Sequence, residues 1–205
     1  MSTFSHHHHD PVEQAVVQAL ADVHARGDGL FSQALVIVND DVTFDDVNGY
    51  RTAVNSAGSG GEAYYSLTAR EGHGHPRPDH VSEDEARLSQ RDSEVATLQD
   101  AYDWLDGQGV TLNVSGVRVV LVGNIGPCDG CKARLNYFLG DVVELFGSKV
   151  PVVVDSVYDT SQAHRQLPRQ GITTVYGYPD ATPYTHTAST GTRTRYWLHR
   201  NSFTP

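Results

Sequence analysis

The sequence is poor in cysteine and has no long hydrophobic run. Its 205 residues include two cysteines, three positions apart, which excludes a disulfide framework and favours a reducing compartment. No apolar run approaches the roughly 18 to 20 residues that a membrane-spanning helix needs. The N-terminal sequence, MSTFSHHHHDP, is typical of neither a signal peptide nor a transit peptide. We therefore expect a cytoplasmic protein that has no membrane partner.

The sequence shows no internal repeat and no second domain. Its length and a hydrophobic content of 39% suit one domain with a sizeable core. We assign residues 10–205 to this domain. Residues 1–9, which include the run His6–His9, are expected to be a disordered N-terminus or a tag.

Apolar periodicity predicts an α/β fold. Asp10 and Pro11 begin a first amphipathic helix that ends at Gly27–Gly29, and two further helices are expected to begin near Ser93 and Cys128. Strands are predicted at Ala34–Val38, Val42–Val54 (a hairpin partner of the first), Val117–Val122, Val150–Val154, Ile172–Tyr178 and Tyr196–Leu198. Glu71–Gln90 is expected to be an irregular insert, and Asp155–Gly171 a polar connection. This order favours a mixed sheet with helices on its faces.

Both cysteines lie at a strand-to-helix junction, in Pro127-Cys128-Asp129-Gly130-Cys131. Once the helix begins, a spacing of three places both thiols on one face of it. The free backbone N–H groups of a first helical turn favour thiolates. Such a pair can chelate a metal ion or form a redox disulfide.

A second polar motif, Asp92-Ser93-Glu94, opens the upstream helix, whose apolar stripe begins at Val95 and Leu98. Together, D-x-E and P-C-x-x-C resemble the signature of the zinc-dependent cytidine deaminase superfamily, which is H-x-E or C-x-E followed by P-C-x-x-C. Pro127 and the two cysteines match that signature, and Glu94 matches its catalytic acid. Asp92 stands where the family usually has histidine, although a carboxylate can also bind zinc.

The resemblance implies both a fold and a function. The fold would be the cytidine deaminase-like three-layer sandwich, a mixed β-sheet with helices on both faces. Asp92, Cys128 and Cys131 would hold Zn²⁺, and Glu94 would shuttle protons while hydroxide attacks C4 of cytosine. The chain looks most like bacterial toxin-type deaminases, which convert cytosine to uracil in nucleic acid. This likeness favours single- or double-stranded DNA over RNA, suggests an immunity protein as partner, and would mean delivery into a target cell.

Charge is distributed unevenly along the chain. Residues 161–205 contain five arginines and one acid, a balance of +4, whereas residues 1–160 have a balance of −14, which gives the net charge of −10. The basic C-terminal part offers Arg193, Arg195, Tyr196 and Trp197 as substrate-binding residues, through phosphate contacts and base stacking. Tyr176, Tyr184 and Arg200 are further candidates for these contacts. The alternative is that these aromatics belong to the core and the arginines offset nearby acids.

Several alternatives stay open at this point. His73, His75 or His80, instead of Asp92, could supply the third zinc ligand. The substrate could be a free cytidine nucleoside. The C-x-x-C pair also suits a thioredoxin-like thiol oxidoreductase, in which D-x-E would have no role. A non-enzymatic zinc module normally needs four protein ligands, and only one C-x-x-C pair is present.

Overall fold

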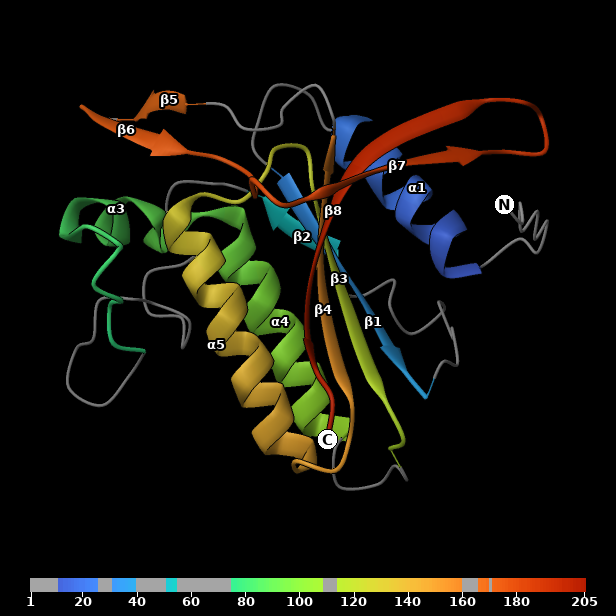
Figure 1. The fold of residues 1–205 in the computed structure, drawn as a ribbon, viewed down its shortest axis with the longest axis horizontal. Coiled ribbons are helices and arrows are strands. Elements are labelled where there is room, and N and C mark those ends of the chain that lie inside the picture. Colours follow the sequence, from blue (N-terminus) through green and yellow to red (C-terminus); the bar gives the residue numbers. More distant parts are fainter. Residues whose placement is uncertain are drawn as a thin grey trace.

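A mixed sheet runs through the middle of the computed structural model, which describes residues 11–25, 31–39, 51–54, 75–108, 114–159, 166–169 and 171–205 (Figure 1). Within these residues the sheet has six strands, in the order β2, β1, β3, β4, β8, β7. Their bounds are β1 Phe31–Val38, β2 Arg51–Val54, β3 Val117–Gly123, β4 Val152–Asp159, β7 Thr182–Thr187 and β8 Arg193–Phe203. A separate antiparallel pair is formed by β5 (Gln166–Arg169) and β6 (Ile172–Val175).

β3 and β4 are parallel neighbours, whereas the other neighbouring strands of the sheet are antiparallel. Parallel neighbours need a crossover connection, and the helix α5 (Asp129–Phe146) provides it. The carboxyl ends of β3 and β4 therefore lie at one edge of the sheet. At this edge the chain leaves β3 and enters α5.

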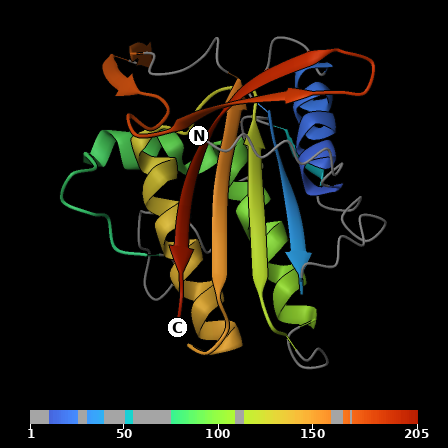
Figure 2. The ribbon, with the colours of Figure 1, turned by 45° about the vertical axis from the view of Figure 1, so that its right-hand side comes forward.

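Helices cover both faces of the sheet (Figure 2). α1 (Pro11–Ala25) packs on one face, and α4 (Ser93–Gln108) and α5 pack on the other. The side chains of each strand alternate between the two cores: in β1, Ala34 and Val36 belong to the core of α4 and α5, whereas Leu35 and Ile37 belong to the core of α1. The expected mixed α/β sheet with helices on both faces is thus confirmed.

Most of the predicted elements are present. α1 ends at Ala25, two residues before the predicted glycines, and β2 pairs antiparallel with β1 as expected of a hairpin. The insert Glu71–Gln90, expected to be irregular, is helical in its second half: Ser82 caps α3 (Glu83–Leu88), which the short 3₁₀ helix η1 (Ser89–Arg91) follows directly. Residues 1–10, 40–50 and 160–165 lie outside the described residues, so the N-terminal histidine run is not tested. No helix in the described part of the chain has both the length and the apolar content that crossing a membrane requires.

Two sequence predictions are wrong in their boundaries. The polar connection expected from Asp155 does not begin there, because β4 continues to Asp159; Asp155 is fully buried, with its carboxylate bound by Arg118 and Arg200. The strand expected at Ile172–Tyr178 ends at Val175, because Gly177 adopts a φ of 78° that breaks the extended chain.

The predicted strand Tyr196–Leu198 is the middle of the longer β8, and its hairpin partner β7 was not predicted. β7 consists mostly of exposed residues, so it has no apolar alternation to detect.

Candidate metal centre

Cys128 and Cys131 lie at the start of α5, at the sheet edge where β3 ends. Cys128 occupies the N-cap position, but its side chain makes no capping hydrogen bond, and Cys131 lies in the first turn. Gly126 allows the preceding loop to pack tightly, because a Cβ atom there would come within 2.5 Å of the Gly177 Cα. The Gly177 N–H donates a hydrogen bond of 2.9 Å to the Pro127 carbonyl oxygen. The loop before the cysteines is therefore fixed to the loop after β6.

Asp92 precedes α4, at the junction with η1. Its backbone is extended (φ −70°, ψ 151°), and its carbonyl accepts a hydrogen bond of 3.1 Å from the N–H of Val95. These are features of an N-cap residue, as the sequence predicts. The turn leaves the Asp92 side chain directed toward α5.

The three side chains meet in the interior. The thiols of Cys128 and Cys131 both donate to one carboxylate oxygen, Asp92 Oδ2, at sulfur–oxygen distances of 3.3 and 3.4 Å. The three ligand atoms lie within 4.8 Å of one another, and the residues are only 5%, 1% and 0% exposed for Asp92, Cys128 and Cys131. Within the part of the chain that the structure describes, this is the group of His, Cys, Asp and Glu residues that could hold a metal ion.

These distances fit zinc. Zinc–sulfur and zinc–oxygen bonds of about 2.3 and 2.0 Å at a tetrahedral angle place sulfur and oxygen about 3.5 Å apart. The observed separations of 3.3 and 3.4 Å are within about 0.2 Å of that value. The protein thus places each of the two soft ligands at nearly the tetrahedral distance from the hard one.

The metal-free thiols are poorly ionised. The neighbouring Cys131 thiol lowers the pKa of Cys128, but burial and the carboxylates of Asp92 and Glu94 outweigh it and raise this pKa to about 11. The neighbouring Cys128 thiol, together with burial, raises the pKa of Cys131 well above its ordinary value. A bound cation would displace both protons and neutralise the charges that oppose ionisation.

Glu94 lies two residues after Asp92, in the first turn of α4. Ser93 Oγ donates a hydrogen bond of 3.1 Å to Glu94 Oε2. The Glu94 charge contributes to raising the pKa of both thiols. Because Glu94 is only half-buried, it is more exposed than the three ligand residues.

A glycine that the sequence reasoning overlooked brings the two helix starts together. A Cβ atom at Gly130, between the cysteines, would collide with the side chain of Ser89 in η1. Ser89 Oγ also accepts a hydrogen bond of 2.8 Å from Nη1 of Arg134, a fully buried residue of α5. Gly130 therefore lets η1, and with it Asp92, approach α5 closely.

Tyrosines of the loop after β6 cover the centre. Tyr176, which is 6% exposed, packs against Cys128 and Cys131. Tyr178 is also buried, its ring stacks on His199 with centroids 3.6 Å apart, and its N–H donates to the Tyr158 hydroxyl. The sequence offered Tyr176 as a base-stacking residue, but the structure places it against the cysteines.

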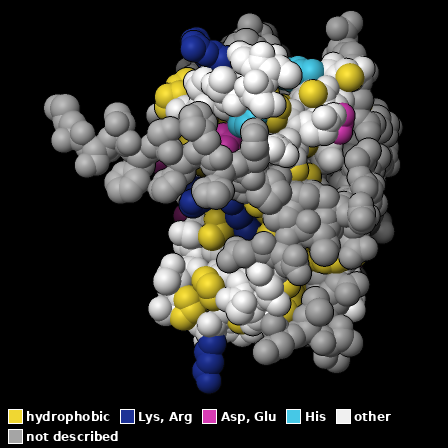
Figure 3. Space-filling model, turned by 90° about the vertical axis from the view of Figure 1, so that its right-hand side faces the viewer, with side chains coloured by type: hydrophobic (Ala, Val, Ile, Leu, Met, Phe, Trp, Pro, Cys, Tyr) yellow, Lys and Arg dark blue, Asp and Glu magenta, His cyan; other side chains and the backbone are white. Residues whose placement is uncertain are grey.

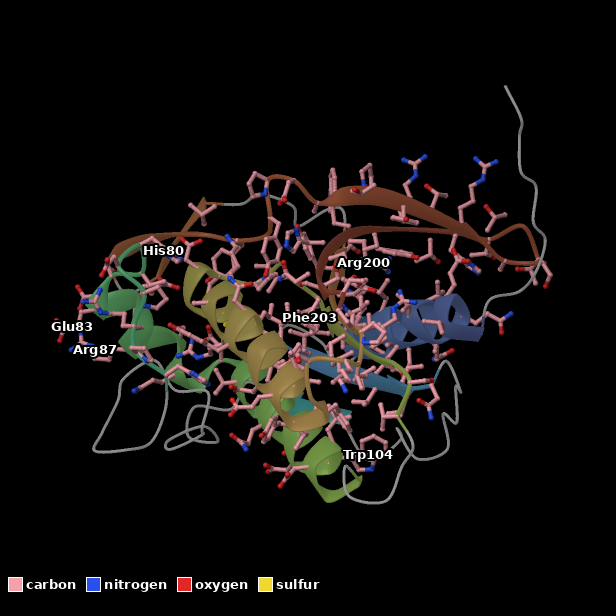
Figure 4. The ribbon with its side chains drawn as sticks, turned by 60° about the horizontal axis from the view of Figure 1, so that its bottom comes forward. His80, Glu83, Arg87, Trp104, Arg200 and Phe203 are labelled. Carbon is pink, nitrogen blue, oxygen red and sulfur yellow. The ribbon has the colours of Figure 1, made fainter. Side chains whose placement is uncertain are left out.

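The alternative histidine ligands lie elsewhere. His75 Nε2 is 3.0 Å from Asp141 Oδ2, and its ring stacks on Tyr137. Asp141 is ten residues beyond Cys131 on α5, about 15 Å along the helix axis. His80 is exposed beside α3 (Figure 4), and His73 lies outside the described residues. Of the candidates that the structure describes, Asp92 is the one that joins the cysteines.

The four predicted substrate-binding residues do not form one cluster. Arg193 and Arg195 are exposed at the start of β8, and Trp197 is half-buried against the core of α4 and α5. Tyr196 is 5% exposed and packs on the opposite face, in the core of α1.

Comparison of the chain with protein-family models, curated proteins and solved structures gives no significant match.

Proposed function

We propose that this protein is a zinc-dependent hydrolase that deaminates cytosine to uracil in nucleic acid. The observation that supports it most directly is the group of three ligand atoms within 4.8 Å of one another, with an acid two residues along the same helix start. Zinc held by three protein ligands keeps a fourth position for chemistry, whereas structural zinc sites normally have four protein ligands. Among the described residues the centre has three such ligands, which suits catalysis better than a structural role.

Each residue of the centre has a role in this reaction. Asp92, Cys128 and Cys131 would hold the ion, and bound zinc would supply Lewis-acid activation of a water molecule. Glu94 would act as general base and then as general acid: it takes the proton of the attacking water and delivers protons to N3 of cytosine and to the leaving amine. The sum of these steps converts cytosine and water to uracil and ammonia.

The order of elements also supports a deaminase-like fold. A helix beginning with D-x-E is followed by a strand and then by a helix beginning with P-C-x-x-C, on one face of a mixed sheet. This order agrees with the family that the two motifs resemble. The finer assignment to the cytidine deaminase fold is part of the proposal.

The thiol oxidoreductase alternative has less support. A redox-active C-x-x-C pair needs an accessible thiol of low pKa. Here both cysteines are almost fully buried, and burial together with nearby carboxylates raises the pKa of Cys128 to about 11. The oxidoreductase would also leave Asp92 and Glu94 without a function.

Nucleic acid, with DNA favoured, is the proposed substrate class. Alternation along β8 directs Arg193, Arg195 and Trp197 to one side of the strand, the side on which Trp197 contacts the core of α4 and α5. Arginines can contact phosphates, and an indole ring can stack on an unpaired base. Tyr196, which points to the other face, does not belong to this set.

The test is a substrate panel with a matched pair of variants. Zinc-loaded protein is incubated with single-stranded DNA, duplex DNA, RNA and free cytidine, and uracil formation is measured in each. Glu94→Gln should keep zinc and the fold while losing roughly a hundred- to ten-thousandfold of the rate. Glu83→Gln, an exposed acid in the first turn of α3 (Figure 4), is the control and should keep the full rate. Full activity of Glu94→Gln, or no uracil from any substrate, would refute the proposal.

A further inference from the structure

A pocket lies on the face of the sheet opposite α4 and α5. It has a volume of ≈240 Å³ and is enclosed by α1, by the strands β3, β4 and β8, and by β7. Its apolar lining includes Val16, Val120, Val157 and Leu198. Because the metal centre is built at the starts of α4 and α5, the sheet separates it from this pocket. Nothing in the proposed deamination uses the pocket.

Two arginines line this pocket, and one buried carboxylate orients both. Asp155 Oδ2 accepts hydrogen bonds from Arg118 Nε (2.8 Å) and Arg200 Nη2 (2.9 Å), and Asp155 Oδ1 accepts one from Arg200 Nε (2.7 Å). Arg118 Nη2 also lies 2.7 Å from Asp155 Oδ2. Asp155 is fully buried, whereas the side chains of Arg118 and Arg200 are 29% and 48% exposed. Figure 4 shows Arg200 below the β7–β8 hairpin.

This arrangement leaves one positive charge and several donors unmatched. Two guanidinium groups face one carboxylate, a balance of +1. Each guanidinium has five N–H donors, and Asp155 uses those on Nε and Nη2. The outer edges of Arg118 and Arg200 can therefore still bind an oxyanion in the bidentate manner that guanidinium favours.

A second acid, Glu13, lines the pocket, but it has a partner other than the two arginines. Its Oε1 is 3.1 Å from His186 Nδ1. Tyr184 and Tyr196 form an aromatic wall, with parallel rings 5.8 Å apart. A ligand thus meets an apolar and aromatic enclosure at one end and two guanidinium edges at the other.

We infer that this pocket binds a small organic monocarboxylate, with its carboxylate on Arg118 and Arg200 and an apolar body of about one ring against Tyr184 and Leu198. The volume lies below the roughly 300–1,000 Å³ of pockets for drug-sized ligands, which sets the size of the ligand. One carboxylate can accept hydrogen bonds from the guanidinium donors that Asp155 does not use.

A polyanion fits this side of the molecule less well. In Figure 3, the described Lys and Arg side chains of this side lie in separate places and do not form one continuous strip. The pocket is also bounded by α1 and β7, and a volume of ≈240 Å³ suits a small molecule better than a nucleic acid backbone.

The inference is tested by titrating the zinc-loaded full chain with benzoate while recording backbone amide NMR spectra. We expect saturable shifts at residues around the pocket, with a dissociation constant on the order of 1 mM, as for a good one-ring ligand. Benzamide, which has the same shape without the charge, should bind at least tenfold more weakly. Inorganic phosphate, an anion without an apolar body, should also bind at least tenfold more weakly.

Three variants identify the binding residues. Arg200→Lys keeps a positive partner for Asp155, and hence the fold, but removes the planar fork and should weaken benzoate binding about tenfold. Tyr184→Ala removes an exposed wall of the pocket and should weaken it severalfold. The matched control is Arg87→Lys, an exposed arginine of α3 on the far side of the molecule (Figures 1 and 4), which should change nothing. Equal affinity for benzamide and benzoate, or unchanged binding in Arg200→Lys, would overturn the inference. No nucleobase is involved, so this result is independent of the deamination assay.

Discussion

Replacing Asp92 tests the metal centre most directly, because this side chain accepts hydrogen bonds from both thiols through one oxygen atom. Apparent zinc-binding free energies of four-ligand protein sites are about 10–16 kcal/mol, so one ligand accounts for about 2.5–4 kcal/mol. Asp92→Ala should therefore weaken zinc binding by roughly a hundredfold to a thousandfold. Asp92→His should restore tight binding, since imidazole binds zinc at nearly the same distance as carboxylate and reduces the negative charge of the site.

The assay is a competition for zinc against a chromogenic chelator. It is carried out after residues 1–9 have been deleted, because His6–His9 can bind zinc on their own and hide a loss. Circular dichroism and thermal unfolding of each variant show that a change in affinity is not a loss of fold. His75→Ala is the control. It removes a half-buried side chain whose partner is the carboxylate of Asp141 on α5, and not a cysteine.

The outcome separates two ligand sets. If Asp92 binds zinc, then His73→Ala, His75→Ala and His80→Ala all keep the affinity of the parent protein. If Asp92→Ala keeps full affinity while one of the histidine variants loses it, the carboxylate is not a ligand. The two sulfur–oxygen distances then do not mark a zinc site.

Four further substitutions test the packing of the fold and the metal assignment, and chemical denaturation measures the stability of each variant. Gly126→Ala should destabilise the protein by at least about 2 kcal/mol, because the new Cβ would lie 2.5 Å from the Gly177 Cα. Gly140→Ala should stabilise it by about 1 kcal/mol, because this helix position has no atom within 4 Å of the new Cβ and alanine favours a helix more than glycine does. Phe138→Ala should cost about 3–5 kcal/mol, since Phe138 is fully buried. Cys128→Ala should lose both zinc and the stability that zinc adds; zinc at full occupancy in this variant would contradict the metal assignment.

The central elements of the fold were predictable because apolar residues dominate them. β1 and β3 are short runs of buried valine, leucine and isoleucine, and hydrophobicity alone detects such runs. α1 has a regular apolar face with Pro11 at its start. In each case the local sequence and the tertiary environment favour the same structure.

The edges of the fold were less predictable, for a physical reason. Asp155 indicates the end of a strand by its polarity, yet β4 continues through it because two arginines from β3 and β8 neutralise it. Those partners are 37 and 45 residues away, so no local pattern reports them. β7 has the same difficulty: its pairing with β8 is a backbone interaction that its exposed side chains do not reveal.

For the candidate site, the sequence provided the ligand types but not the residues that bring them together. Asp92, Cys128 and Cys131 were recognisable from helix-start motifs. The role of Gly130, which makes room for Ser89, depends on a contact between η1 and α5. The place of Tyr176 against the cysteines depends on the loop contact between Gly177 and Pro127. The dipeptide Asp129-Gly130 between the two cysteines was the only local sign of this close helix contact, and on its own such a dipeptide indicates only a turn.

The meeting of the two motifs follows from the lengths of the elements between them. Asp92 and Cys128 are 36 residues apart, and both stand directly before a helix. The 16 residues of α4 run about 24 Å away from the first motif, and the seven residues of β3 run back about 23 Å. Because these lengths are nearly equal, α5 begins level with the start of α4. Both helices are on the same face of the sheet, so their starts meet with sulfur and oxygen at the spacing that zinc requires.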